Sequence, residues 1–301
     1  MNKPFVSVII PVLNDSERLQ TCLKALENQT YLKSMYEVIV VDNGSDENIE
    51  GLVSQYIQAK LSYESCPGSY AARNKGLSIA KGYIIAFTDS DCIPAPDWIE
   101  KGIANLLRVP NCGLVAGKVN IFFKNPDKPT AVELFESVIA FQQKRYAEVR
   151  GFGATANVFT FRSVIDHVGN FNEKLKSGGD VEWGQRVFSY GYKLTYTDDA
   201  CVAHSARYSL KELYNKHIRI LGGEYDLIKS TSSYPFIILI KNLFIEFLPP
   251  VISLARIYSS EKFKRLNGTL QKCKVILVFL FIRYARIWER IRLLLVVRSI
   301  G

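Results

Sequence analysis

Two carboxylates one residue apart, Asp89 and Asp91, end the apolar segment YIIAFTDSDC at residues 83–92. The apolar part predicts a buried strand, and a buried strand has no need of acids at its end. Carboxylates at this spacing can reach one ligand, and Mg²⁺ or Mn²⁺ prefers oxygen ligands and often bridges to substrate phosphates. The alternative is that the two acids only cap the turn before Pro94.

Two further apolar strands are expected to end in polar residues. The segment 5–11 runs into IPVLN at 10–14, and the segment 36–42 runs into VVDNGS at 40–45. In an open α/β sheet, ligands bind at the carboxyl ends of the strands. These polar ends are therefore expected to meet the two acids in one crevice.

The elements that would position these residues alternate between strand and helix along the first half of the chain. Strands are expected at residues 5–11, 36–42, 60–64, 83–89, 113–121, 155–161 and 192–198. Helices are expected at residues 15–29, 46–59, 68–82, 96–108, 130–150 and 180–190. Asp15 or Ser16 is the expected N-cap of the first helix. This alternation predicts a parallel, doubly wound sheet.

Charge and cysteine content narrow the classes of protein. The net charge is +9, and residues 207–301 hold 17 Lys and Arg against 6 Asp and Glu. The basic character therefore belongs to the C-terminal third, which favours contact with an anionic surface and argues against a nucleic-acid partner. The six cysteines form no CxxC pair, so a reducing compartment is the simpler expectation. The apolar run near the N-terminus is too short for a signal peptide and is assigned to the first strand.

The C-terminal third is expected to be helical and apolar. Charges or prolines interrupt both of its long apolar stretches, residues 234–258 and 275–297, so neither predicts a clean spanning helix. Arg283, Arg286 and Arg290 fall on one helical stripe, a pattern typical of a helix lying in a membrane interface. A helical subdomain or a dimer interface would bury the same apolar faces.

Five segments in order resemble the motifs of family 2 glycosyltransferases. They are VSVIIPVLN (6–14), EVIVVDNGSDE (37–47), GSYAARNKGL (68–77), IAFTDSD (85–91) and GGDVEWGQRVFSYGYKL (178–194). The resemblance covers about residues 4–206. It implies an α/β GT-A fold, with a Rossmann-like, mostly parallel sheet flanked by helices. The domains are then expected at 1–206, with a nucleotide-sugar half at 1–95 and an acceptor half at 96–206, followed by a helical, membrane-associated region at 207–301.

The resemblance also implies which residues bind a nucleotide-sugar donor. Residues expected to contact the nucleoside or diphosphate are Pro11, Leu13, Asn14, Asp42, Asn43, Arg73 and Ser90. Asp42 would accept hydrogen bonds from base or ribose, while also forming an Asx-turn. Many relatives carry a second Asp where Asn43 stands.

A divalent metal is implied at the D-x-D. Asp91 is expected to ligate Mn²⁺ or Mg²⁺, with Asp89 nearer the ribose, and His204 is expected to complete the metal or phosphate site. The metal would neutralise the departing diphosphate as a Lewis acid.

Asp180 matches the general base of inverting members, which takes the proton of the attacking sugar hydroxyl. The usual Glu before it is replaced by Gly179, so Glu182 is kept as an alternative base. Asp180 could also be the N-cap of the helix at 180–190. Trp183 could stack on a sugar or pack in the core. Gly153, in the segment 151–159, is expected to shape the acceptor side.

The sequence therefore favours an inverting glycosyltransferase of a bacterial-type polysaccharide or glycolipid pathway. It would act at the cytoplasmic face of the membrane on a glycan or lipid-linked acceptor. A sugar nucleotidyltransferase is the alternative enzyme, although PVLNDSERL (11–19) lacks a glycine-rich phosphate loop. A degenerate carbohydrate-binding relative is the non-enzymatic alternative. The segment QQKRY (142–146) resembles a processive-synthase signature but precedes the base motif, so processivity is not expected.

Overall fold

The structure, a computed structural model, describes residues 3–298 and the side chains of residues 3–295. The chain divides into two compact units. The N-terminal unit comprises the described residues up to Asn120 together with Phe141–His204. The C-terminal unit comprises Ile121–Ala140 and the described residues from Ser205 on. Two strands, β6 (Cys112–Phe122) and β8 (Lys193–Ser205), carry the chain from one unit into the other.

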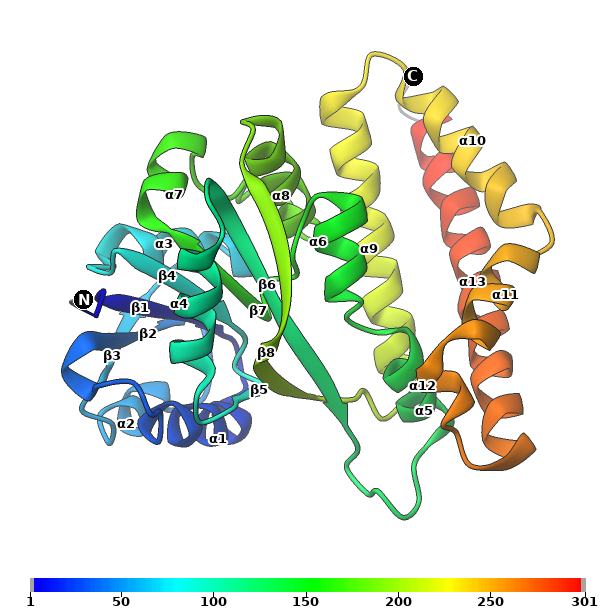
Figure 1. Cartoon of the computed structure of the whole chain (residues 1–301). Coiled ribbons are helices and arrows are strands. Elements are labelled where there is room, and N and C mark those ends of the chain that lie inside the picture. The colour runs from blue at the N-terminus through cyan, green and yellow to red at the C-terminus, as the bar shows by residue number, and fades with distance from the viewer. Residues whose placement is uncertain (1–2, 299–301) are drawn as a thin grey trace. The chain divides into compact units, whose positions relative to one another are not determined.

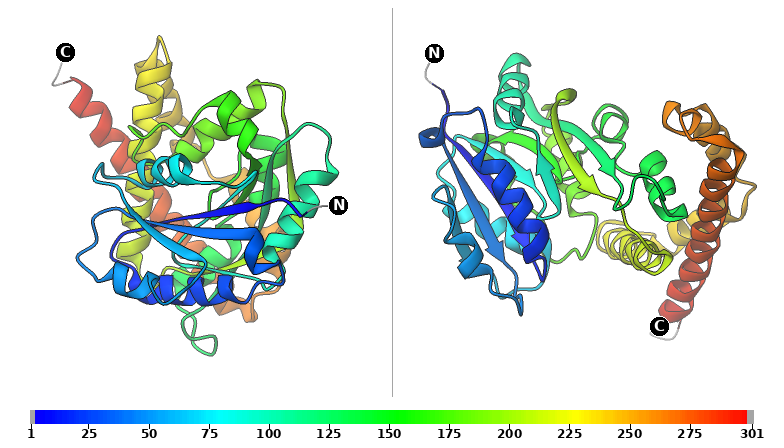
Figure 2. Two further views of the ribbon diagram at one scale, coloured as in Figure 1. Left: turned by 90° about the vertical axis from the view of Figure 1, so that its left-hand side faces the viewer. Right: turned by 90° about the horizontal axis from the view of Figure 1, so that it is seen from below.

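Most of the N-terminal unit is one sheet with its covering helices (Figures 1 and 2). Its other strands are β1 (Val6–Val12), β2 (Tyr36–Asp42), β3 (Ala59–Tyr63), β4 (Ile84–Thr88), β5 (Cys92–Pro94) and β7 (Asn157–Phe161). Its helices are α1 (Ser16–Glu27), η1 (Lys33–Met35, a 3₁₀ turn), α2 (Ile49–Val53), α3 (Ser69–Ile79), α4 (Trp98–Arg108), α6 (Gln143–Arg150), α7 (Arg162–Val168) and α8 (Gly179–Ser189).

The eight strands lie in the order β3-β2-β1-β4-β7-β6-β8-β5. The strands β3, β2, β1 and β4 pair in parallel, as the alternation of strand and helix predicts. Beyond β4, the pairings of β7 with β4 and β6, and of β5 with β8, are antiparallel. The sheet is therefore mixed rather than mostly parallel. Periodicity marks a strand but carries no information on its direction, which depends on the edge to which a long connection returns.

Helices cover both faces of the parallel strands. On one face, Val8 and Ile10 of β1 share a core with apolar residues of α1, α2 and α4. On the other face, α3 packs on β1 and β2. Its Gly76 allows this close approach, since a Cβ there would lie 2.5 Å from a methyl group of Ile9. With both faces covered, these strands are near-continuous apolar runs, as is usual for parallel sheets.

Several elements differ from their expected bounds. The helix expected at 46–59 is only α2, because the chain must turn at Tyr56 to bring Ala59 into register with Val38. The helix expected at 130–150 is two helices, α5 (Ala131–Ile139) and α6, separated at Phe141, whose φ of 47° ends a helix. β5 is three residues long and was not expected.

The C-terminal unit is helical. It contains α5, α9 (Leu210–Thr231), α10 (Pro235–Phe247), α11 (Val251–Ser259), α12 (Glu261–Lys264) and α13 (Gly268–Arg298). Its core joins Val132 and Phe135 of α5 to Leu213 of α9 and to Val275 and Ile282 of α13. The segment 121–140 was assigned to the catalytic domain from sequence, but its apolar face is covered by helices that follow it by more than 70 residues.

The arginine stripe on α13 does not form an outward polar face. Arg283 donates to the backbone carbonyl of Glu246, and Arg286 lies 2.6 Å from the Glu246 carboxylate. Arg290 is buried and pairs with Glu224 at 2.9 Å. The stripe therefore ties α13 to α9 and α10, which corrects the picture of a basic face turned to a membrane.

The apolar C-terminal helices are short or interrupted by charges. Among the described residues, no single helix is both long and apolar enough to cross a bilayer. α10 and α11 meet the criterion of length and composition only as a pair, and the pair is bent by 63°.

Candidate active site

The loops that follow β1 and β2 are tied to each other. The backbone N–H of Asn14 donates to the Ser45 hydroxyl at 2.9 Å, and the Asp46 N–H donates to the Asn14 side chain at 2.8 Å. Asn14 adopts a positive φ of 51°, which asparagine tolerates better than most residues. Leu13 beside it is exposed. The β1 and β2 ends therefore form one rim, as their polar residues predict, with Pro11 paired to Val41 inside the sheet.

Asp42 and Asn43 have different surroundings. Asp42 accepts from the Ser45 N–H at 2.9 Å, three residues along the chain, so its carboxylate holds the loop without forming the expected Asx-turn, whose donor lies two residues on. The Asn43 amide donates to the carbonyls of Glu64 and Cys66 and accepts from the Gly68 N–H. These bonds occupy the Asn43 side chain, so it is structural here rather than a substrate contact. An Asp at this position could not donate the first two bonds, which accounts for the departure from the family pattern.

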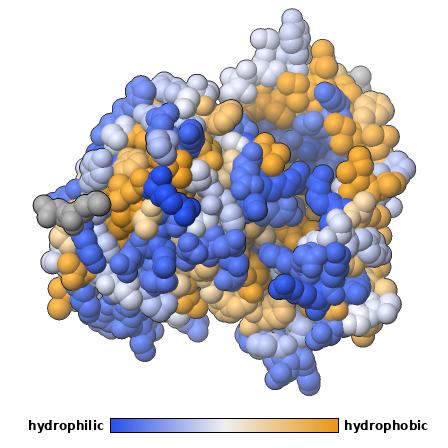
Figure 3. Space-filling model, in the orientation of Figure 1, coloured by the Kyte–Doolittle hydropathy of each residue, from blue (hydrophilic) through white to orange (hydrophobic). Residues whose placement is uncertain are grey.

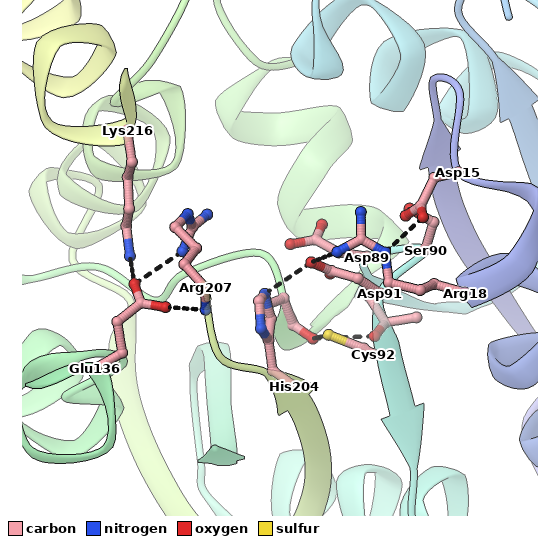
Figure 4. A network of polar contacts seen from close by, with 12 residues as sticks. Asp15, Arg18, Asp89, Ser90, Asp91, Cys92, Glu136, His204, Arg207 and Lys216 are labelled. Atoms are coloured by element: carbon pink, nitrogen blue, oxygen red, sulfur yellow. Dashed lines mark hydrogen bonds and ion pairs between the residues drawn. The ribbon is translucent and has the colours of Figure 1, made fainter. Parts of the chain in front are cut away.

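The first acid of the D-x-D pairs with Arg73, which was expected to contact the nucleoside or diphosphate of the donor. Arg73 of α3 lies 2.5 Å from Asp89, and its guanidinium is buried. Its Nε has no hydrogen-bond partner among the described residues. Ser90 donates to Asp15 at 2.7 Å, and Asp15 lies 2.5 Å from Arg18 (Figure 4). Asp15 therefore begins α1 without a side-chain capping bond, because its carboxylate is used by Ser90 and Arg18.

The second acid lies against the predicted histidine. Asp91 Oδ2 is 3.3 Å from His204 Nε2, and Arg18 approaches the same oxygen at 3.7 Å (Figure 4). His204 is buried, and it is held in register opposite Cys92 by the pairing of β5 with β8. Burial raises the pKa of Asp91, although His204 opposes the shift. The half-buried Asp91 carboxylate and the His204 imidazole are donors that suit Mn²⁺ or Mg²⁺. A bound cation would stabilise the ionised form of the carboxylate.

Cys92 lies close enough to join this pair, since ligand atoms of Asp91, Cys92 and His204 are within 4.8 Å of one another. Burial raises the pKa of the Cys92 thiol well above its usual value, and the carboxylates of Asp89 and Asp91 add to the shift. The thiol donates instead to the carbonyl of Ala156. Mn²⁺ and Mg²⁺ prefer oxygen and imidazole donors to sulfur, so the donors that fit such a metal are Asp91 and His204, with Asp89 beside them.

Asp180 lies in the first turn of α8, whose N-cap is Gly178 rather than Asp180 itself. Its Oδ1 accepts from its neighbour's backbone, Val181 N–H, at 2.9 Å, and from the Tyr70 hydroxyl at 3.3 Å. Burial raises the pKa of Asp180, and the charge of Arg73 is the largest opposing influence. A carboxylate with a raised pKa is suited to accept a proton near neutral pH.

Three other predicted residues have structural contacts. Glu182 forms a bidentate pair with Arg186, at 2.9 and 3.0 Å. Trp183 is 1% exposed and donates to the Gly169 carbonyl, so it is a core residue and presents no face to a sugar. Gly153 is buried, and a Cβ there would lie 3.0 to 3.1 Å from neighbouring side chains, so it serves packing.

The structure adds residues that the sequence patterns did not single out. Asp15, Arg18 and Tyr70 contact predicted site residues, and Asn74 exchanges two hydrogen bonds with the backbone of Phe171, in the loop before α8. Tyr70 and Arg73 are three residues apart on α3 and so share a helical face. That spacing is the one sequence signal that could have indicated Tyr70.

The mixed sheet, the strand-end acids and the helix carrying Asp180 together define a GT-A-type glycosyltransferase. The sequence profile described as "Glycosyl transferase family 2" matches residues 7–169, more than half of the chain. The chain belongs to glycosyl transferase family 2.

Relatives agree with this assignment. The glycosyltransferase AglE of Haloferax volcanii is 41% identical over 226 residues, which cover 73% of this chain and 73% of that protein. The pre-mycofactocin glycosyltransferase of Mycobacterium tuberculosis is 28% identical over 69% of this chain and 44% of its own length.

Solved structures show the same fold. The mannosyltransferase PcManGT from Pyrobaculum calidifontis, in complex with GDP-Man and Mn²⁺, has a TM-score of 0.61 at 17% identity. That comparison covers all of this chain and 87% of the other. GalNAc-T7 with UDP, GalNAc and Mn²⁺ has a TM-score of 0.55 at 18% identity, over 68% of this chain and 44% of its own.

Proposed function

We propose that this nucleotide-sugar glycosyltransferase moves one sugar from a UDP-, GDP- or dTDP-linked donor to a glycan or lipid-linked acceptor, with inversion. The acceptor oxygen forms a bond to the anomeric carbon while the bond from that carbon to the diphosphate breaks. The acceptor proton passes to a carboxylate, and the nucleoside diphosphate leaves. The observation that carries the proposal is the placement of Asp91, His204 and Asp180 in one unit, with Arg73 and Tyr70 between the strand-end acids and α8.

Asp91 and His204, with Asp89 beside them, would hold Mn²⁺ or Mg²⁺. The metal would supply Lewis-acid neutralisation of the departing diphosphate. Two proteins of the same fold were solved with a nucleotide or nucleotide sugar and Mn²⁺, which supports this cofactor. Arg73 keeps Asp89 oriented and brings positive charge to the donor side of the site.

Asp180 is the proposed base. It has a raised pKa and lies at the start of a helix, and its carboxylate is held by two donors. Glu182 is the weaker candidate, because its carboxylate is already paired with Arg186. Arg186 also donates to the loop carbonyls of Val168 and Asn170. Removing Glu182 would therefore take away one partner of the arginine that holds this loop.

The proposal extends to the cytoplasmic face of a membrane, in polysaccharide or glycolipid synthesis. The C-terminal unit exposes large apolar side chains on α10 and α11, and Figure 3 shows apolar surface over α10. They include Phe244 and Phe247 of α10 and Val251 and Ile252 of α11, and Leu248 between the two helices is exposed as well. The region from residue 207 also carries 17 basic against 6 acidic residues. Exposed apolar side chains together with excess positive charge are typical of interfacial binding to anionic lipid.

Family membership sets aside the sugar nucleotidyltransferase alternative. The degenerate carbohydrate-binding alternative depends on the missing Glu at position 179. Against it stand the intact pair Asp91–His204 and the held carboxylate of Asp180.

Thermal unfolding of the full chain with a panel of nucleotide sugars tests the proposal. A ligand that binds the native state raises the melting temperature by mass action, so the correct donor with Mn²⁺ should give the largest rise. Release of UDP, GDP or dTDP from that donor would then show turnover. If no nucleotide sugar raises the melting temperature or is turned over with Mn²⁺, the donor class is wrong.

A further inference from the structure

The position before Asp180 is occupied by glycine for a reason that the structure shows. A Cβ on Gly179 would lie 2.8 Å from two atoms of the Tyr70 ring and 2.9 Å from a third. Contacts shorter than 3.0 Å are not tolerated by real side chains, so any residue larger than glycine would force the ring to move. The Tyr70 ring therefore occupies the space that a side chain at position 179 would need.

The ring cannot easily move aside. Tyr70 is 7% exposed and stacks on Phe171, with 5.8 Å between the ring centroids. Phe171 is fixed by its two backbone hydrogen bonds with Asn74, one turn along α3 from Tyr70. The Arg73 guanidinium lies 5.7 Å from the Tyr70 ring centroid, a cation–π distance.

The hydroxyl at the end of this fixed ring points at the proposed base. It donates to Asp180 Oδ1, at 3.3 Å, while the Val181 N–H donates to the same oxygen. Burial, followed by the Asp180 charge, raises the pKa of Tyr70, so the phenol stays protonated and remains a donor. One oxygen of Asp180 is thereby fixed, which leaves the other to accept a proton.

We propose that Tyr70 is a positioning residue for Asp180, and that the pair Tyr70–Gly179 replaces the acidic residue that precedes the base in the family's usual motif. This inference rests on the proposed role of Asp180. In this arrangement the motif can lack its Glu and still keep the base oriented, because the Tyr70 phenol donates a hydrogen bond to Asp180. A second acid would instead add negative charge beside the base.

The test uses the full-length chain with Mn²⁺ and the most active donor of a panel containing UDP-glucose, UDP-N-acetylglucosamine and GDP-mannose, with nucleotide release as the readout. We expect Tyr70→Phe to lower kcat about tenfold, the order of effect of one hydrogen bond to a charged group, with little change in donor KM. The phenylalanine keeps the ring packing, and an unchanged melting temperature would confirm this.

The pH profile separates positioning from packing. The groups facing Asp180 are Tyr70 and Arg73 from α3, Asp89 at the end of β4 and Tyr146 from α6. Only the Tyr70 hydrogen bond is lost in Tyr70→Phe. That bond favours the ionised carboxylate, so its loss should move the acid limb of the kcat profile to higher pH.

A double substitution tests whether the Tyr70 ring and a side chain at position 179 compete for the same space. Gly179→Glu alone should lose most activity through the clash with the ring, and Gly179→Glu combined with Tyr70→Ala should recover part of it. If the double variant is no more active than Gly179→Glu, or if Tyr70→Phe leaves both kcat and the acid limb unchanged, the inference is overturned. If instead Asp180→Asn keeps normal turnover, it is the base assignment in the proposed function that fails.

Discussion

At the scale of single residues, burial affects Asp91 and Cys92 differently although the two are neighbours in the chain. Burial raises the pKa of both, but His204 opposes the shift only for Asp91. The imidazole therefore favours the charged form of the Asp91 carboxylate, whereas no such partner offsets the burial of the Cys92 thiol. Oxygen and nitrogen donors without a thiolate suit Mn²⁺ or Mg²⁺ better than a soft metal.

We expect Asp91→Asn to abolish the Mn²⁺ dependence of donor binding while the melting temperature without ligand stays close to that of the wild type. The amide removes the charge that a divalent cation requires. Titration calorimetry of the donor with and without Mn²⁺ measures the effect, and Cys92→Ser is the matched control. Equal Mn²⁺ dependence in Asp91→Asn and the wild type would contradict the metal assignment.

Asp180→Asn should keep donor affinity and lose most turnover, by a factor on the order of 10²–10⁴, because a base acts on the acceptor proton in the transition state. Single-turnover kinetics with the donor identified by thermal shift checks this. Glu182→Gln is the control, and it should affect stability through Arg186 more than turnover. The opposite pattern would make Glu182 the base.

Sequence could predict the acids, Arg73 and His204, but not Tyr70, which holds Asp180. Asp89, Asp91 and Asp180 stand in motifs whose spacing is local, so the sequence placed them at the ends of strands and on α8. Tyr70 is 110 residues from Asp180, and only tertiary packing brings them together. Trp183 was a predicted site residue that the structure places in the core. A tryptophan on an amphipathic helix gives the same sequence pattern whether it faces a ligand or the core.

At the scale of elements, a buried ion cluster links α5 to the start of α9. Glu136 is 1% exposed, lies 2.9 Å from Arg207 and 2.7 Å from Lys216, and accepts from the Arg207 N–H (Figure 4). These partners lower the pKa of Glu136 to about 2 against the effect of burial. Burial also lowers the pKa of Lys216, so the cluster stabilises the unit by less than the Glu136 shift alone would suggest.

Replacing Glu136 by Gln should therefore destabilise the fold by about 3 kcal/mol, because it leaves buried cations without their anion. Chemical denaturation at pH 7 measures the change. Glu261→Gln, at an exposed pair with Lys264, is the control and should have little effect.

The same cluster predicts how stability depends on pH. A carboxyl group whose pKa is lower in the folded than in the unfolded state stabilises the fold above its unfolded pKa, and that contribution is lost as pH falls through its folded pKa. For Glu136 the loss should run from the ordinary value of 4.5 down to about 2. The free-energy difference between wild type and Glu136→Gln should shrink over this range, and a constant difference would show that Glu136 is not ionised.

At the scale of the whole molecule, the chain passes between its two units three times, at residues 120/121, 140/141 and 204/205. The sequence pattern predicts a single boundary at 206/207, close to the last passage. The insertion of 121–140 could not be predicted, because α5 is amphipathic in sequence and nothing local shows that α13 covers it. A truncation after residue 233 would uncover Val132 and Phe135, so it is a poor test of membrane binding.

Single substitutions test membrane binding without that defect. Ile252 on α11 is 75% exposed, and Ile57 in the N-terminal unit is 97% exposed. Ile252→Glu should reduce co-sedimentation with anionic vesicles several-fold, since it places a charge where apolar contact with lipid is proposed, and Ile57→Glu should not. Raising the salt should weaken binding of the wild type, because salt screens the electrostatic part. Equal sedimentation of the two variants, or a stable soluble dimer that ignores vesicles, would assign the apolar helices to a protein interface.

The insertion of α5 also affects the order of events on the ribosome. α5 ends at Ile139 and α13 begins at Gly268, so about 130 residues must be synthesised before the covering helix exists, which takes on the order of 6 to 26 seconds at typical elongation rates. During that interval Val132, Leu134, Phe135 and Val138 have no native cover from α13. Exposed apolar surface on a nascent chain is a binding site for chaperones. Ribosome-bound chains that end between residues 140 and 268 should therefore associate with chaperones, and chains extended beyond α13 should be released from them.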